Sequence, residues 1–141
     1  MSNSEIINLV NNKEWDKLIK KLDNINVIIW NNLRLIHYAA IQNDLNLFNK
    51  LVEKNVKLNL VNNTAETIAH ITASNGYFNM FKKIIDLEPK IIYNKNSFME
   101  TPFHLIADNY DIVKYILKYK EIDFNYLFKQ KNHKGQTPLL V

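Results

Sequence analysis

A short phrase recurs along this chain at nearly constant spacing. Its best copy is residues 101–107, Thr-Pro-Phe-His-Leu-Ile-Ala, and weaker copies surround His70 and His37. His70 follows His37 by 33 residues, and His104 follows His70 by 34. Thr before Pro favours a helix start, because Thr caps the first turn and Pro loses no hydrogen bond at the first helical position. A fixed period of this length predicts stacked structural repeats.

The phrase resembles the Thr-Pro-Leu-His-x-Ala phrase of the ankyrin repeat family. In that family a second helix follows and ends in paired aliphatic residues, as Leu51-Val52, Ile84-Ile85 and Ile116-Leu117 do here. Residues 132–138, Asn-His-Lys-Gly-Gln-Thr-Pro, match the lead-in to the family's first helix. The resemblance implies an all-α solenoid of stacked antiparallel helix pairs joined by hairpin-like fingers.

We expect one ankyrin-repeat domain over residues 1–141. It would hold a degenerate N-terminal capping repeat at 1–30, repeats at 31–61, 62–92 and 93–128, and the start of a truncated repeat at 129–141. A terminal repeat has a neighbour on one side only, so its outer face is polar. A bare apolar end at residues 139–141 would lack such a cap. We therefore expect a longer protein to continue beyond Val141, the alternative being a stub.

The chain has only two glycines. Asn43 and Asn55 stand where the family usually has glycine, and Gly76 keeps it. Asn is the best non-glycine residue for a left-handed backbone, so we expect that conformation at these positions. The fourth repeat lacks two residues between its helices, which predicts a shorter first helix and a tighter turn at residues 108–111.

The composition excludes several classes of function. There is no cysteine, which rules out disulfides, thiolate catalysis and cysteine metal sites. The net charge of +4 is carried almost wholly by lysine, with Arg34 the sole arginine, so we expect a solvated surface and no nucleic-acid site. No apolar run is long enough for a membrane span. The abundance of Asn, Ile and Lys is typical of AT-rich genomes, such as those of giant viruses or intracellular pathogens.

Three histidines invite a metal or catalytic interpretation, and the spacing opposes it. Equivalent positions on stacked helices lie roughly 8–10 Å apart, whereas zinc ligands lie about 2 Å from one ion. The resemblance implies that each histidine hydrogen-bonds backbone between repeats. We therefore expect no cofactor, no metal and no enzyme activity. Structural roles are expected for His37, His70, His104, Thr67, Thr101, Pro102 and Gly76.

The resemblance implies that a partner protein binds the finger tips and the exposed side of each first helix. The tips would be residues 30–33, 62–66, 95–100 and 129–134. The candidate partner-binding residues are Trp30, Leu33, Tyr38, Gln42, Asn63, Glu66, Ile71, Asn75, Phe98, Met99 and Leu105. Large apolar residues at exposed tips suit interface anchors. For Phe98 and Met99 the alternative is burial by the adjacent finger, and for Trp30 it is folding back onto the stack.

These observations favour a monomeric protein–protein interaction scaffold, the N-terminal recruiting segment of a longer protein, in the cytoplasm of its own or a host cell. One alternative is a recognition module fused to a catalytic domain beyond Val141. Another is a basic surface that docks an acidic polymer or nucleic acid. The identity of the partner does not follow from the sequence.

Overall fold

The computed structural model describes the backbone of residues 1–30 and 33–140. It contains two compact units, Met1–Lys57 and Leu58–Val141. Among the described residues the one sheet has two strands, and helices make up the rest of the regular structure. The predicted all-α fold is therefore confirmed, while the division into one domain with five segments stays a prediction.

The first unit contains two helix pairs separated by a small hairpin. Its elements are α1 (Asn3–Asn11), α2 (Trp15–Lys21), β1 (Ile28–Trp30), β2 (Leu33–Arg34), α3 (Leu35–Gln42) and α4 (Leu45–Glu53). Ser2 caps α1 by accepting the N–H of Glu5, and Asp44 caps α4 by accepting the N–H of Leu47. The antiparallel pairing of β1 with β2 agrees with the predicted hairpin. Its tip, Asn31 and Asn32, lies outside the described residues.

The core of the first unit forms where the two helix pairs meet. The buried ring of Trp15 on α2 packs edge-on against Tyr38 on α3, with ring centroids 5.9 Å apart. Lys50 on α4 donates to Asp16 on α2 at 2.9 Å. Trp15 and Leu18 lie three residues apart on one side of α2, and both are buried.

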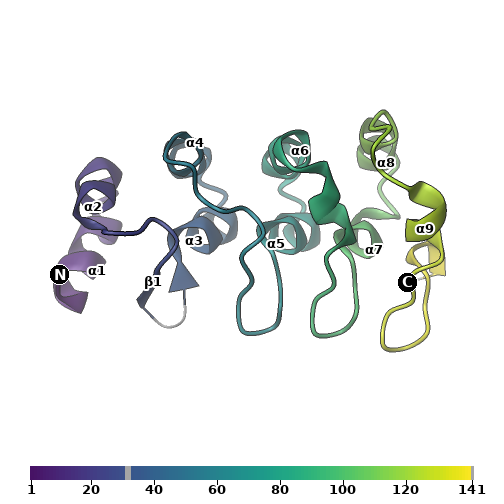
Figure 1. The fold of residues 1–141 in the computed structure, drawn as a ribbon, viewed down its shortest axis with the longest axis horizontal. Helices are drawn as coiled ribbons and strands as arrows, with labels where there is room; N and C mark the ends of the chain where they lie inside the picture. The colour runs from purple at the N-terminus through teal and green to yellow at the C-terminus, as the bar shows by residue number, and fades with distance from the viewer. Residues whose placement is uncertain (31–32, 141) are drawn as a thin grey trace. The chain divides into compact units, whose positions relative to one another are not determined.

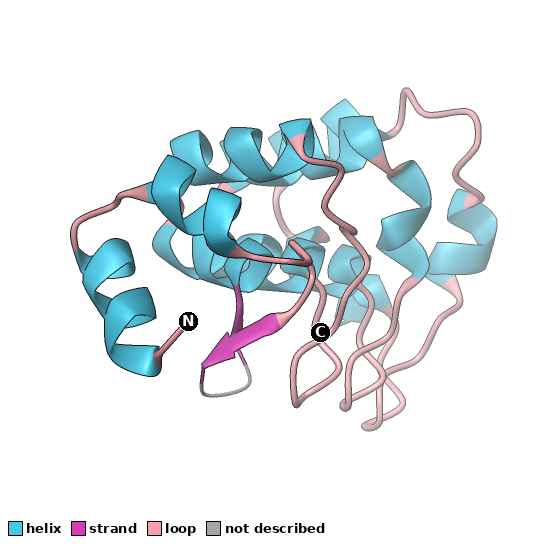
Figure 2. Ribbon diagram, turned by 60° about the vertical axis from the view of Figure 1, so that its left-hand side comes forward, coloured by secondary structure: helices cyan, strands magenta, loops and turns pink. Residues whose placement is uncertain are grey.

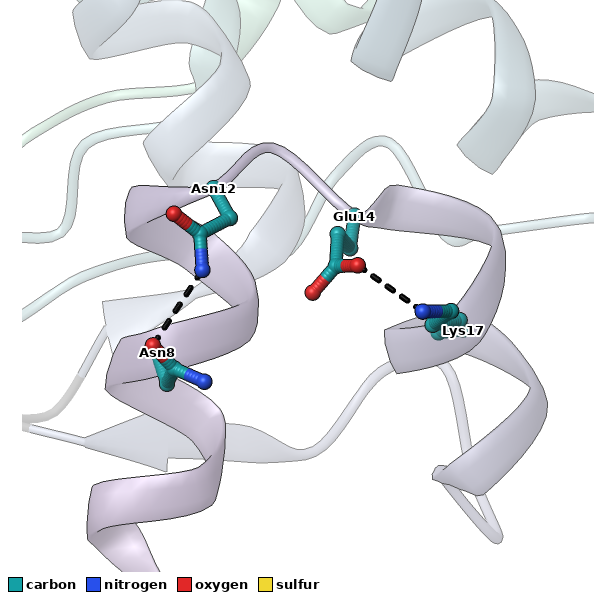
Figure 3. Close-up of polar contacts among 4 residues, drawn as sticks. All are labelled: Asn8, Asn12, Glu14 and Lys17. Carbon is teal, nitrogen blue, oxygen red and sulfur yellow. Dashed lines mark hydrogen bonds and ion pairs between the residues drawn. The ribbon is translucent and has the colours of Figure 1, made fainter.

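Polar side chains along α1, α2 and the turn between them make hydrogen bonds with one another (Figure 3). Asn12 donates to the side chain of Asn8 at 3.2 Å, and Lys17 pairs with Glu14 at 2.9 Å. The hydrogen bond from Lys17 to Glu14 raises the pKa of Lys17 above its ordinary value. Lys20 and Lys21 are exposed in the last turn of α2. The assignment of this segment as a capping repeat stays a prediction.

The second unit contains the helices α5 (Ile68–Asn75), α6 (Phe78–Leu87), α7 (Pro102–Ile106), α8 (Tyr110–Ile116) and α9 (Phe124–Phe128), with 3₁₀ turns η1 (Pro89–Tyr93) and η2 (Pro138–Leu140). Within this unit α5 packs against α6 and α7, and α6 packs against α8. The loops that precede α5, α7 and η2 extend side by side away from α6 and α8 (Figures 1 and 2). We call them fingers.

Helix α9 lies between α8 and the last finger, a segment for which we predicted no helix. Asp123 caps this helix by accepting the N–H of Tyr126. Phe124 and Phe128 then lie edge-on to the fully buried ring of Phe103 on α7, with centroids 6.1 and 5.4 Å apart. Helix α9 therefore packs against α7 and extends the buried core on that side.

The predicted left-handed positions are confirmed. Asn43 ends α3 with φ 52°, Gly76 ends α5 with φ 73°, and Asn55 follows α4 with φ 60°.

The prediction of a shortened first helix in the fourth repeat is confirmed as well. Helix α7 has 5 residues, whereas its counterpart α5 has 8. Asn109 caps the following α8, so the turn between them needs no glycine.

Candidate functional site

His70 links the start of α5 to the finger before α7. Its Nδ1 accepts the backbone N–H of Thr67 at 3.2 Å and lies 3.0 Å from the Thr67 hydroxyl. A backbone N–H can only donate, so this Nδ1 carries no proton. The proton is therefore on Nε2, which donates to the carbonyl oxygen of Glu100 at 2.9 Å. One ring caps its own helix and ties it to the next finger.

His104 repeats this arrangement one period later. Its Nδ1 accepts the backbone N–H of Thr101 at 3.1 Å, and its Nε2 donates to the carbonyl oxygen of Gln136 at 3.2 Å. The Thr101 hydroxyl in turn accepts the backbone N–H of His104 at 3.3 Å. Pro102 occupies the first helical position, where it needs no N–H partner. Thr67, Thr101, Pro102 and both histidines thus lie at helix starts, and the histidines also contact the following finger; the structural roles expected of these residues stay a prediction.

The hydrogen bonds and the burial of the two histidine rings both favour the neutral form. Burial disfavours the charged ring and lowers the pKa of His70 and of His104 below the ordinary histidine value. Protonation of Nδ1 would also remove the acceptor that holds the N–H of Thr67 or Thr101. His37, the third member of the series, is likewise fully buried on α3. There Arg34 replaces the capping threonine, so the hydroxyl of the phrase is missing.

Each finger of the second unit is built on an asparagine. The side-chain oxygen of Asn96 accepts the N–H groups of Phe98 and Glu100, both at 2.9 Å. Its amide donates to the Glu100 carboxylate at 3.1 Å. Asn62 makes the same contacts with Thr64 and Glu66, and Asn132 makes them with Lys134 and Gln136. We name the fingers by these turns: 62–66, 96–100 and 132–136.

Neighbouring fingers are joined to one another by backbone hydrogen bonds. Ser97 N–H donates to the carbonyl of Thr64 at 2.9 Å, and His133 N–H donates to the carbonyl of Phe98 at 2.9 Å. The donor and acceptor positions are equivalent in the two pairs. The three fingers therefore form one continuous edge with a fixed spacing.

The fourth residue of each finger has a left-handed backbone. Gly135 has φ 75°, Ala65 has φ 58° and Met99 has φ 60°. Glycine takes this conformation freely, whereas other L-residues such as methionine are strained by about 1–2 kcal/mol. Met99 thus keeps a long apolar side chain at a position that favours glycine.

The predicted tip residues Phe98 and Met99 do lie at the end of the 96–100 finger. Their side chains are 50% and 47% exposed. The Phe98 ring is tilted at 46° against His133, with centroids 5.4 Å apart, and the His133 ring nitrogen Nδ1 contacts the Phe98 carbonyl at 3.2 Å. The adjacent finger therefore covers part of Phe98 and leaves an exposed apolar surface.

Two of the expected positions are corrected by the structure. Ile71 was expected on the exposed side of the first helix and is buried, with 5% exposed, because α5 packs between α6 and α7. The last tip was expected at residues 129–134, and the turn lies at 132–136, because α9 extends to Phe128 and shifts the finger toward the C-terminus.

The remaining candidate residues occupy varied environments. Gln42, Asn63 and Asn75 are exposed, whereas Leu33, Tyr38 and Leu105 are half-buried. Glu66 is half-buried, and its carboxylate accepts from Asn62 and Thr64 within its own finger. The side chain of Trp30 and the prediction attached to it lie outside the described residues. We did not identify the asparagine frame from the sequence; by this frame we mean Asn62, Asn96 and Asn132 with the hydrogen bonds that they make inside their fingers. Asn does recur five residues before Thr67, Thr101 and Thr137.

Metal sites and membrane spans each need a particular grouping of residues. Among the described residues no group of three or more His, Cys, Asp or Glu side chains is placed to hold a metal ion. Over the same part of the chain, no helix has the length and apolar character needed to cross a membrane.

A family model described as ankyrin repeats, in three copies, matches residues 36–127. The chain belongs to the ankyrin repeat family. This match confirms the resemblance drawn from the histidine phrases. No curated protein matches the sequence. Ankyrin repeats are generally modules for protein–protein interaction and typically do not catalyse reactions.

Proposed function

We propose that this chain is a non-catalytic scaffold that binds another protein through the fingers of its second unit, with Phe98 and Met99 as apolar anchors. The observation that carries the proposal is the backbone of Met99. Strain of this kind persists where the surrounding structure imposes it, and it clusters at functional sites. Here it is combined with a half-exposed side chain, which gains little from burial within the chain.

The rigidity of the fingers supports the same proposal. Asn96 fixes the turn from inside, and backbone hydrogen bonds hold the 96–100 finger between its two neighbours. A preorganised surface loses less entropy on binding than a flexible loop does. The exposed Asn63 on the first of these fingers and Lys134 on the third lie at positions that can supply the polar rim of such an interface.

The test is a comparison of variants against a protein captured with the full chain from an extract of its source cells. We expect Phe98→Ala combined with Met99→Ala to weaken binding of the purified partner by more than about 1 kcal/mol. The thermal midpoint should change little, because both side chains are half-exposed. Ile7→Ala, which truncates a similarly exposed aliphatic side chain on α1 in the first unit, should leave binding unchanged. Equal affinity of the double variant and the parent would exclude this surface.

A further inference from the structure

A cluster of lysines and tyrosines lies on α6, on α8 and on the turn that follows α8. Both helices lie on the side of the second unit away from the fingers (Figure 1). We call the cluster the lysine–tyrosine face; it comprises Lys82, Tyr110, Lys114, Tyr115, Leu117, Lys118 and Tyr119. The Lys118 ammonium lies 3.9 Å from the centre of the Tyr115 ring and 5.2 Å from that of Tyr119. Lys82 lies 4.9 Å from the Tyr115 ring centre, and Lys114 lies 6.0 Å from that of Tyr110.

The lysines of this face take part in none of the ion pairs found among the described residues. Among the described residues, ion pairs join Lys17 to Glu14 and Lys50 to Asp16. No carboxylate lies within ion-pair distance of Lys82, Lys114 or Lys118 in that part of the chain. The ring contacts position these ammonium groups and leave their hydrogen-bond donors available.

Apolar surface accompanies the charge. Tyr110 is 74% exposed and Leu117 is 52% exposed. Leu117 follows the last residue of α8 and keeps a right-handed helical backbone. It is seven residues from Tyr110, so the two lie on one side of the helix with Lys114 between them. A ligand on this face would therefore meet two apolar contacts and several ammonium groups together.

The face also contains fixed negative charge. The Tyr115 hydroxyl donates to both carboxylate oxygens of Asp86, at 2.8 and 2.9 Å. Asp111 is exposed in the first turn of α8. A uniformly charged polymer or an anionic lipid surface would bring phosphates against these carboxylates, and juxtaposed like charges are unfavourable. A protein segment can place its carboxylates beside the lysines and its apolar side chains beside Tyr110 and Leu117.

We propose that the lysine–tyrosine face is a second interaction surface, which docks an acidic protein segment that carries interspersed apolar residues. The lysines favour a partner with carboxylates. The exposed Tyr110 and Leu117 beside them favour a partner that also carries apolar side chains. This surface is separate from the fingers, so binding at the two sites is independently testable.

The experiment measures fluorescence anisotropy of a labelled peptide of Glu-Glu-Leu repeats with the full chain. The parent should bind this peptide and should not bind a Gln-Gln-Leu peptide of equal length. Lys114→Gln combined with Lys118→Gln should raise the dissociation constant roughly fivefold or more, since two charge contacts are lost. Lys20→Gln combined with Lys21→Gln removes the same charge from exposed lysines on α2 and should change it less than about twofold.

Several results would overturn the proposal. They are absence of Glu-Glu-Leu binding by the parent, equal binding of the glutamine peptide, and a loss in the α2 variant as large as in the α8 variant. Tighter binding of oligouridine, or of phosphatidylserine-containing vesicles, would instead assign the face to nucleic acid or membrane. Circular dichroism of each variant shows whether the helices are intact, so that a folding defect is not read as a loss of binding.

Discussion

The Nε2 of His70 donates to the carbonyl oxygen of Glu100 at 2.9 Å, across 30 residues of sequence. The same ring accepts the N–H of Thr67, so a single side chain satisfies polar backbone groups in two neighbouring repeats. Repeat proteins depend on such nearest-neighbour contacts, because each repeat is marginal alone.

We expect His70→Ala to lower the free energy of unfolding by about 2–3 kcal/mol, since it leaves the Thr67 N–H and the Glu100 carbonyl without their partner. Urea denaturation measures this change. The matched control is His133→Ala, the same substitution at an exposed ring on a finger, which should cost less than about 1 kcal/mol. Equal losses in the two variants would contradict the structural role of His70.

Stability should also depend on pH through the two buried rings. The folded-state pKa of His70 and of His104 lies below the unfolded value, so the unfolded chain binds more protons as the solution becomes acidic. Their contribution is complete above about pH 6.5 and is lost as the pH falls through the folded-state pKa. Thermal midpoints measured between neutral pH and about pH 5 should decline. A His70→Gln, His104→Gln double variant should show a shallower decline, and an unchanged slope would refute this assignment.

The asparagine frame leads to a third prediction. Asn96→Ala removes the acceptor of the Phe98 and Glu100 N–H groups, so it should destabilise the 96–100 finger by about 1–3 kcal/mol. Hydrogen exchange at those two amides should accelerate more than exchange in α5. The control Asn79→Ala changes an exposed asparagine within α6 and should leave the finger amides protected. Unaltered exchange at Phe98 would show that the finger does not depend on Asn96.

The repeat period made most of the fold predictable. Thr67-His70 and Thr101-His104 recur at fixed spacing, and the geometry that places each histidine follows from that phrase. Asn43 and Asn55 were predicted to be left-handed because they stand where the family usually has glycine and because Asn tolerates that conformation. These inferences succeeded because each depends on local chemistry within one repeat.

The features that were missed depend on irregular or long-range relations. Helix α9 has a local signal, the capping residue Asp123 before the apolar residues Phe124, Leu127 and Phe128, but the repeat phrases of the family predict no helix there. Met99 has no intrinsic preference for a left-handed backbone. The sequence signal for this conformation is that Met99 and Gly135 occupy equivalent positions, each three residues before a proline. The lysine–tyrosine face joins Lys82 on α6 to Tyr115 on α8, so it appears only in three dimensions.

The most direct test of the proposed interface is Met99→Gly, measured by thermal unfolding and by isothermal titration with the captured partner. Glycine relieves the strain at φ 60° but loses more entropy on folding, so the net gain in stability should be about 0.5–1 kcal/mol. Loss of the exposed side chain should weaken binding by roughly 1 kcal/mol or more. Stability and affinity would thus change in opposite directions. A variant that is more stable and binds as tightly as the parent would contradict the account.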